Sequence, residues 1–398
     1  MREGERSGRR SAQGGARLVA LALASVFSGC HAPVVKNDAH QLYEPAEHGR
    51  DGFVRVLDMN VHYVEAGPDE PAAAADPPIV LIPGAFSTYR VWNRVLPLLA
   101  AHHRVFALDY IGTGDSDKPE EGFGYTVGEE ADVVAAFLRE LGLEKPLLAG
   151  VSYGASIALN VAARYPELPG RVVCVEGGVV IAPDVLKYGH FDAIFAVPVF
   201  GDSVLFLGSL GFFRESIAKS IMADAWDQLS EPERDQIVAI QASYLKTTVR
   251  SAMYDVYRAI TGYIDFTAEM ERETAPILYL YGESSRYRDV AEANIAFFRE
   301  RRCNVETLLL KNGIHDLQLQ YPRAVAEIIL DDARRARDPA PAPRPIGPVA
   351  IDSVACVRGQ NFAAAPRPGR AGAHALRTQA PPVMGEDLRP IPYLDPEE

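Results

Sequence analysis

Residues 146–164, PLLAGVSYGASIALNVAAR, form the stretch that decides the fold. Its opening apolar run predicts a buried strand, and its second half, from Ala155 onward, predicts a helix. Between them stands GVSYG at 150–154, a G-x-S-x-G pattern in a strand–turn–helix setting. Such a turn holds its serine in a strained conformation, and side chains two residues before or after it would collide with the neighbouring elements. The pattern therefore predicts that Ser152 presents its hydroxyl at the end of a strand.

Short apolar runs alternate with helical patterns along much of the chain. The segment FVRVLDMNVHYVEAG at 53–67 alternates apolar and polar residues, which is typical of a β-hairpin. Further strands are predicted at 79–82, 104–108, 146–149, 172–175, 277–281 and 305–310, and helices at 92–101, 126–141, 155–164 and 321–337. This alternation predicts an α/β fold, a doubly wound and mostly parallel sheet with helices on both faces.

The alternation stops near residue 180. Residues 181–270 have mostly helical patterns and are rich in aromatic side chains, which either form a core or line an apolar pocket. We therefore predict one domain in two parts, residues 51–180 and 271–337, with 181–270 inserted between them as a helical cap.

Composition and charge exclude several classes of protein. The chain has 398 residues with 40 Lys+Arg against 53 Asp+Glu, and this acid excess argues against a nucleic-acid-binding protein. The hydrophobic content of 48 % is that of an ordinary globular protein. The four cysteines form no C-x-x-C pair, so a zinc ribbon and a thioredoxin-like motif are excluded.

The two ends of the chain are predicted to lie outside the fold. A basic head at 1–17 and the apolar run LVALALASVF at 18–27 are typical of a secretory signal, here residues 1–29. The run is about half the roughly 20 residues that a membrane-spanning helix needs. The polar composition of residues 30–50 predicts a tether between this signal and the folded domain. Residues 338–398 are rich in Pro, Ala and Arg and predict a disordered tail.

Ser28-Gly29-Cys30 follows the apolar run and resembles the lipobox of bacterial lipoproteins, although Phe27 stands where Leu is usual. The resemblance implies that Cys30 is lipidated, becomes the first mature residue and anchors an exported protein to a cell-envelope membrane. The alternative is an ordinary signal peptide and a soluble secreted or periplasmic protein.

A base for Ser152 is predicted at His315. It stands in LLLKNGIHDLQLQYP at 308–322, after the last predicted strand and before the final helix. The carboxyl ends of parallel strands meet at one sheet edge, where doubly wound sheets bind ligands, so His315 is expected to reach Ser152. Of the other histidines, His62 lies in the hairpin, and His102 and His103 precede a strand at its amino end.

Together with these motifs, residues 52–335 resemble the α/β-hydrolase superfamily. The segment IPGAF at 82–86 corresponds to the His-Gly oxyanion loop of that family, with Pro83 in place of the histidine. The segment DYIGTGDSDKP at 109–119 matches the family's D-x-x-G-x-G-x-S-x-x-P pattern, and the helical insertion matches its cap. The resemblance implies that the backbone N–H groups of Ala85 and Tyr153 bind the oxyanion.

The acid of the expected triad departs from the family's common pattern. The family usually has Asp three residues after a glycine that ends the seventh strand, where this chain has Ser285. Some members, including certain dehalogenases, supply the acid after the sixth strand instead, and this position corresponds to Glu176. The resemblance therefore implies Ser152, Glu176 and His315 as catalytic residues. Glu283, Asp289 and Asp316 stay open as alternatives for the acid.

The implied activity is hydrolysis of carboxylic esters with apolar acyl groups, through an acyl-enzyme and without a metal or organic cofactor. A serine nucleophile argues against a haloalkane dehalogenase or an epoxide hydrolase, because those relatives use Asp at this position. C–C or amide hydrolysis, a cofactor-free haloperoxidase-like activity, and an inactive binding or scaffold protein are the alternatives. The inactive binding or scaffold protein is considered because Pro83 and Ser285 depart from the family's pattern. The oligomeric state is left open.

Overall fold

The computed structural model describes residues 45–68, 76–183, 185–186, 191–301 and 305–335, and the backbone of 351–353. The predicted signal at 1–29, Cys30 and most of the predicted tether lie outside the described residues, as does nearly all of the tail predicted at 338–398. Within the described residues, no helix combines the length and the apolar composition needed to cross a bilayer.

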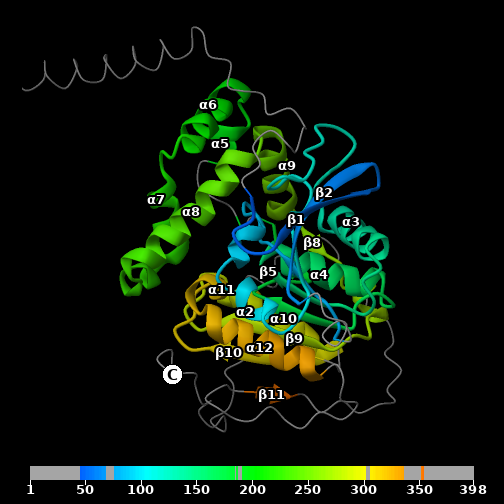
Figure 1. Cartoon of the computed structure of the whole chain (residues 1–398). Helices are drawn as coiled ribbons and strands as arrows, with labels where there is room; N and C mark the ends of the chain where they lie inside the picture. The colour runs from blue at the N-terminus through cyan, green and yellow to red at the C-terminus, as the bar shows by residue number, and fades with distance from the viewer. Residues whose placement is uncertain are drawn as a thin grey trace, which may run out of the picture. The chain divides into compact units, whose positions relative to one another are not determined.

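One large sheet forms the centre of the described part of the chain (Figure 1). Its strand order is β1-β2-β4-β3-β5-β6-β9-β10-β11. The strands are β1 (Arg50–Val56), β2 (Met59–Ala66), β3 (Ile79–Ile82), β4 (Val105–Leu108), β5 (Leu147–Val151), β6 (Arg171–Val175), β9 (Ile277–Gly282), β10 (Val305–Leu310) and β11 (Ile351–Ser353). The strands from β4 to β10 pair in parallel, and β1, β2 and β11 pair antiparallel at the two edges. The predicted α/β fold with a mostly parallel sheet is therefore confirmed.

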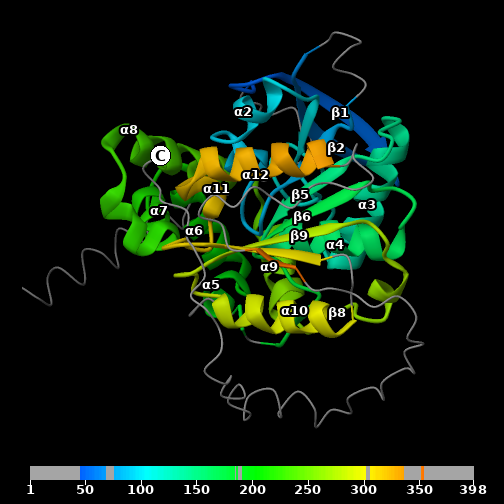
Figure 2. The same cartoon turned by 90° about the horizontal axis from the view of Figure 1, so that it is seen from below.

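Helices cover both faces of the sheet. One face packs against α3 (Val127–Glu140), α4 (Tyr153–Arg164) and α10 (Arg288–Arg301), and the other against α2 (Leu96–Ala100) and α12 (Pro322–Arg335). Figure 2 shows α10 and α12 on opposite sides of the strands. Every residue of β3, β4 and β5 is buried, which explains why these strands are continuous apolar runs instead of alternating patterns.

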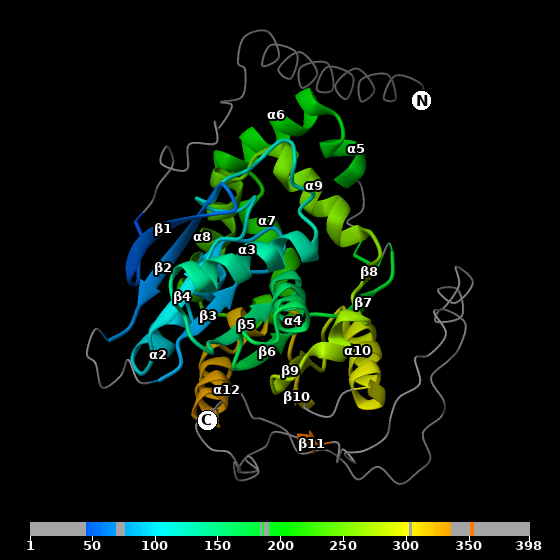
Figure 3. The same cartoon turned by 90° about the vertical axis from the view of Figure 1, so that its right-hand side faces the viewer.

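A helical segment is inserted between β6 and β9, in the region predicted as a cap. It contains α5 (Phe191–Phe195), α6 (Pro198–Ser209), α7 (Arg214–Met222), η2 (Ala223–Gln228), α8 (Glu231–Thr247) and α9 (Arg250–Thr261). Figures 1 and 3 show these helices gathered beside one another. The short strands β7 (Val180–Ile181) and β8 (Ile264–Asp265) pair antiparallel where the segment begins and ends.

Some elements differ from the prediction. The helix predicted at 92–101 is wrong in its bounds, because the chain forms a 3-10 turn, η1 (Tyr89–Trp92), and then the short α2. Pro97 lies in the first turn of α2, where a missing N–H is tolerated, whereas inside a longer helix it would break the ladder. Helix α10 was not predicted. Three residues of the tail predicted as disordered form β11, which pairs with β10.

A buried ion cluster joins the β1–β2 hairpin to the end of β4. His62 on β2 is fully buried, with Nδ1 2.8 Å from Asp109 Oδ2 and Nε2 3.0 Å from Asp51 Oδ1. Burial alone would lower the pKa of His62, but the two hydrogen bonds and the charges of Asp109 and Asp115 outweigh it and raise the pKa to about 9.

The same cluster satisfies the geometric requirement for a metal site, because one ligand atom each of His62, Asp109 and Asp115 lie within 4.8 Å of one another. Both ring nitrogens of His62 are already bound to carboxylates, and a protonated histidine cannot ligate a metal. Asp109 also accepts the N–H groups of Tyr89 and Asp115. We therefore interpret the cluster as a structural ion pair.

This pairing makes stability depend on pH. The pKa of His62 is about 9 in the folded chain against an ordinary 6.5, so its stabilisation is complete below about pH 6.5 and is lost as the pH rises through about 9. Protonated His62 contributes at most about 3 kcal/mol to the free energy of unfolding. Raising the pH from about 6.5 to about 9 should therefore lower the Tm of the wild type more than that of His62→Gln, and thermal unfolding at a series of pH values measures both.

The comparison with His62→Gln separates His62 from Lys118, whose pKa burial lowers to about 8. Equal pH dependence of Tm in the wild type and in His62→Gln would show that His62 carries no charge in the folded chain.

Candidate active site

Ser152 lies in the sharp turn between β5 and α4. Its backbone has φ 53° and ψ −118°, in the region that L-residues rarely occupy. A Cβ added at Gly150 would collide with the carbonyl of Gly154, and one added at Gly154 would collide with the carbonyl of Pro83. The two glycines are therefore required by the close packing of the turn, which leaves the Ser152 side chain partly exposed.

Glu176 follows directly after β6, the strand next to β5. Val151 and Val175 are paired in register, so Ser152 and Glu176 leave their strands at the same level of the same sheet edge. The N–H of Ser152 donates to the carbonyl of Val175 at 2.7 Å. Glu176 also has a positive φ of 58° and is 6 % exposed. Two strained residues thus stand side by side where the parallel strands end.

The carboxylate of Glu176 has a hydrogen-bond partner for each oxygen. Oε1 accepts the backbone N–H of Gly282 at 2.6 Å, and Oε2 accepts the hydroxyl of Ser285 at 2.6 Å. Oε2 also lies 3.1 Å from Nδ1 of His315. A buried carboxylate is stable only when such donors replace water, and these three donors fix its orientation.

His315 lies after β10 and before the short helix α11 (Leu317–Gln320), and its side chain is 12 % exposed. Burial alone would lower its pKa, but the hydrogen bond and charge of Glu176, with the charge of Asp316, raise the pKa above its ordinary value. Nδ1 donates to Glu176, so the neutral ring keeps Nε2 as a proton acceptor. The ring of Tyr287 packs edge-on against His315, with centroids 4.7 Å apart.

The structure therefore brings Glu176 and His315 together. Among the described residues it places no hydrogen bond between Ser152 and His315, although both belong to loops at the same sheet edge. Hydrogen bonds to a catalytic nucleophile often form only in the complex with substrate, so this geometry does not exclude the pair.

The three alternative acids are hydrogen-bonded to other groups or exposed. Glu283 accepts the N–H of Asn312 at 3.0 Å, and Asp316 accepts the side-chain amide of Gln318 at 3.1 Å. Asp289 is exposed in the first turn of α10. Of the four candidates, Glu176 is the one whose carboxylate is hydrogen-bonded to the His315 ring.

The loop after β3 runs beside Ser152. A Cβ added at Gly84 would lie 3.4 Å from the Cβ of Ser152. Ala85 follows in this loop, and Tyr153 begins α4 directly after Ser152. In the part of the chain that the structure describes, the N–H groups of Ala85 and Tyr153 have no hydrogen-bond acceptor. Both donors are therefore available to an anionic oxygen next to Ser152.

Aromatic side chains connect this loop to the helical insertion. The ring of Phe86 lies 5.4 Å from that of Phe191 in α5 and 6.1 Å from that of Tyr244 in α8. Phe191 in turn stacks on Tyr257 in α9, with centroids 4.3 Å apart. The residue after Ala85 thus belongs to an apolar cluster contributed by three helices of the insertion.

Sequence reasoning missed two residues that contact the pair. The sequence indicates Ser285 only as the residue at the family's usual Asp position, whereas in the structure its hydroxyl donates to Glu176. Its place at the family's usual Asp position was a usable signal. Tyr287, which packs on His315, has no signal in the sequence, because its contact depends on how the loop after β9 folds.

Comparisons with known proteins identify the family of the chain. The family model described as "Alpha/beta hydrolase family" matches residues 79–328. A haloalkane dehalogenase of Mycolicibacterium paratuberculosis is 34 % identical over 120 residues, which are 30 % of this chain and 38 % of that protein. Epoxide hydrolase 3 of Xenopus tropicalis is 22 % identical over 301 residues, 71 % of this chain and 78 % of that protein.

Among solved structures, a hydrolase from Pseudomonas aeruginosa superposes with a TM-score of 0.56 at 20 % identity, covering 71 % of this chain and 98 % of that one. The match to the dehalogenase spans less than two fifths of that protein, and the structural likeness at this identity shows the fold alone. The family model covers more than half of the chain, including β5, Ser152 and His315. The chain therefore belongs to the alpha/beta hydrolase family.

Proposed function

We propose that this hydrolase cleaves carboxylic esters through an acyl-enzyme, with Ser152 as nucleophile, His315 as base and Glu176 as the acid that orients His315. The observation that carries the proposal is the buried Glu176–His315 hydrogen bond at the sheet edge where Ser152 emerges. A buried carboxylate beside an imidazole stabilises the imidazolium that forms when the base takes a proton.

The proposed reaction has two half-steps. Ser152 Oγ attacks the ester carbonyl carbon while its proton passes to Nε2 of His315, and the N–H groups of Ala85 and Tyr153 stabilise the oxyanion. Collapse of the tetrahedral intermediate expels the alcohol, which takes the proton from His315 and leaves acylated Ser152. His315 then activates a water that releases the acid and restores the serine. The residues named here suffice, so the proposal includes neither a metal nor a cofactor.

The nucleophile separates this proposal from the activities named for the relatives. A serine that displaced a halide or opened an epoxide would become an alkyl ether, which water does not readily hydrolyse. A serine that attacks a carbonyl becomes an ester, which His315 and water can hydrolyse. The aromatic cluster around Phe86 supports the proposal that the substrates have apolar acyl groups. Amide, C–C and haloperoxidase-like reactions are the alternatives within the same residue set.

An inactive binding or scaffold protein is the other candidate, motivated by Pro83 and Ser285. The contacts of both residues count against it. Pro83 packs its carbonyl against Gly154 and so belongs to the turn that holds Ser152. Ser285 donates to Glu176 and so supports the carboxylate that replaces the usual Asp.

We also propose that the protein is exported and anchored to a cell-envelope membrane through lipidated Cys30. The support is the basic head, the short apolar run and Ser28-Gly29-Cys30 in the sequence. A soluble secreted or periplasmic protein is the alternative.

Replacing Glu176 should slow turnover and shift its pH dependence. Glu176→Gln removes the charge that raises the pKa of His315, so the rising limb of kcat/KM against pH should move to lower pH. The amide also favours the wrong tautomer, so kcat should fall at least about a hundredfold. Steady-state ester hydrolysis across pH measures both effects.

Asp289→Asn and Glu283→Gln are the matched controls and should keep wild-type kcat. If Glu176→Gln keeps nearly wild-type turnover while either control abolishes it, Glu176 is not the acid.

Covalent labelling tests the nucleophile. A fluorophosphonate should modify the wild type at Ser152 and leave Ser152→Ala unmodified, because the reagent phosphonylates an activated serine hydroxyl. A panel of esters of graded acyl length should then show the highest kcat/KM for apolar acyl groups. A wild type that stays unlabelled and inactive on the whole panel supports the scaffold alternative.

Fractionation of cells tests the anchor. Several acyl chains contribute about 0.8 kcal/mol per buried methylene, which suffices for stable membrane attachment. The wild type should therefore sediment with membranes, and Cys30→Ser should lose the lipid mass measured on the mature N-terminal peptide. A wild type found in the soluble fraction contradicts the proposal.

A further inference from the structure

Large exposed apolar side chains are concentrated on α6 and the turn that follows it. Of the nine such side chains among the described residues, six lie within residues 197–213, each between 47 and 65 % exposed. They are Val197, Val199, Phe200, Leu210, Phe212 and Phe213. These side chains form two groups, one at each end of α6. Scattered exposed apolar residues are normal, but six within 17 residues of one helical segment point to an interaction surface. We call residues 197–213 with these side chains the α6 patch.

Helix α6 is apolar on both of its faces. Gly201, Leu205 and Gly208 form the buried stripe that packs on the rest of the insertion. The opposite stripe is Val199, Ser203, Phe206 and the C-cap residue Leu210, and the two ends of this stripe are exposed. The only charged residue of α6, Asp202, pairs with Arg250 in α9 at 3.3 Å. A surface helix ordinarily carries charged side chains on its outer face, so this face is suited to an apolar environment.

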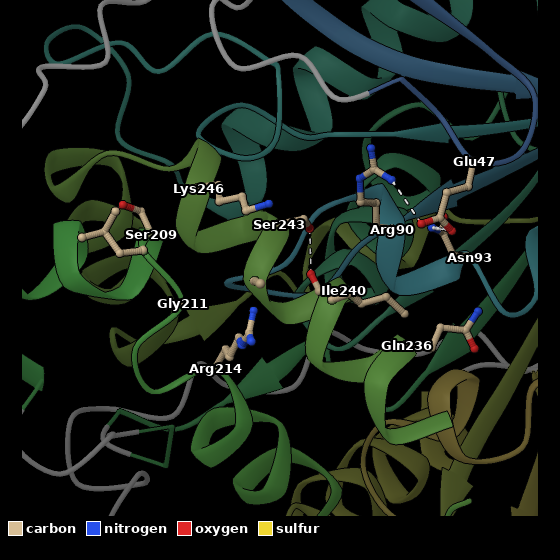
Figure 4. A pocket seen from close by; sticks show the side chains of 13 residues that line it. Glu47, Arg90, Asn93, Ser209, Gly211, Arg214, Gln236, Ile240, Ser243 and Lys246 are labelled. Carbon is tan, nitrogen blue, oxygen red and sulfur yellow. Dashed lines mark hydrogen bonds and ion pairs between the residues drawn. The ribbon is translucent and has the colours of Figure 1, made fainter. Parts of the chain in front are cut away.

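A cationic pocket adjoins the α6 patch (Figure 4). It has a volume of about 260 Å³ and lies between η1, the α6–α7 turn and α8. Leu210 of the patch also lines the pocket. Arg90 forms an ion pair with Glu47, the one carboxylate among the lining residues, at 3.9 Å, and Arg214 and Lys246 add two further positive charges. This surplus of positive charge occurs in a chain whose net charge is −13.

We propose that the α6 patch docks on a lipid bilayer and that the adjoining pocket receives the headgroup of an anionic lipid. Apolar side chains that enter the acyl boundary beside cations that bind phosphate are the arrangement by which proteins lie on anionic membranes. A protein partner fits less well, because the cores of protein interfaces are depleted in lysine. The proposal does not depend on the catalytic assignment or on lipidation of Cys30.

The test uses the full chain carrying Cys30→Ser, synthesised without membranes so that no acyl chain is attached. Vesicles contain phosphatidylcholine alone or phosphatidylcholine mixed with phosphatidylglycerol, and binding is measured by co-sedimentation. Val199→Ser/Phe212→Ser changes the patch, and Arg214→Gln/Lys246→Gln changes the pocket. Leu57→Ser/Tyr263→Ser is the matched control, because both residues are equally exposed apolar side chains outside the patch. Thermal unfolding verifies that each variant is folded.

The Cys30→Ser chain without further changes, which serves as the wild type of this test, should bind both vesicles and prefer the anionic ones. The patch variant should bind at least about tenfold more weakly to both compositions, since two large apolar side chains no longer enter the bilayer. The pocket variant should lose roughly tenfold in affinity for anionic vesicles and keep its affinity for neutral ones. The control variant should bind like the wild type.

Three results would overturn the proposal. The first is unchanged vesicle binding by the folded patch variant. The second is an equal loss in the patch and control variants, which would show that binding follows general surface hydrophobicity and not the α6 patch. The third is a self-associating wild type that the patch variant converts to monomer while vesicle binding stays the same, which would make the face an interface between two copies of the chain.

Discussion

The strained turn at Ser152 is the constraint on which the rest of the site depends. The chain can leave β5 and enter α4 this sharply only because Gly150 and Gly154 have no side chains. The same closeness brings the loop of Pro83 against the turn and Gly84 next to Ser152. A strained residue costs about 1–3 kcal/mol, and the buried strands on both sides of β5 supply the packing that sustains it.

In the parallel part of the sheet, the ends of four neighbouring strands bring the residues of the candidate site together. Ser152 follows β5, Glu176 follows β6, the N–H donor Gly282 ends β9, and β10 leads to His315. The carboxylate of Glu176 is thus held by groups that come from its neighbours in the sheet. The raised pKa of His315 follows from that carboxylate. It therefore depends on the strand order that brings Glu176 next to His315.

The mostly parallel α/β sheet and the strand–turn–helix setting of Ser152 could be predicted from the sequence, because apolar runs and the alternation of elements are local signals. Contacts between distant segments could not. The pairing of His62 with Asp109 joins β2 to the residue after β4, and no local sequence pattern indicates that the two residues are in contact. The donation from Ser285 to Glu176 likewise depends on the loop after β9. The split of the predicted helix at 92–101 had a local signal in Pro97, which the apolar spacing outweighed.

The β7–β8 pair has a consequence for how such a protein can change over evolution. Val180 pairs with Asp265 and Ile181 with Ile264, so the helical insertion leaves and rejoins the core at one point. Its ends are already held together, and the entropy of closing the loop depends only weakly on its length. Helices can therefore be lengthened, shortened or exchanged within the insertion without moving the strand ends that hold Ser152, Glu176 and His315. The insertion and the cluster at the sheet edge can therefore change independently.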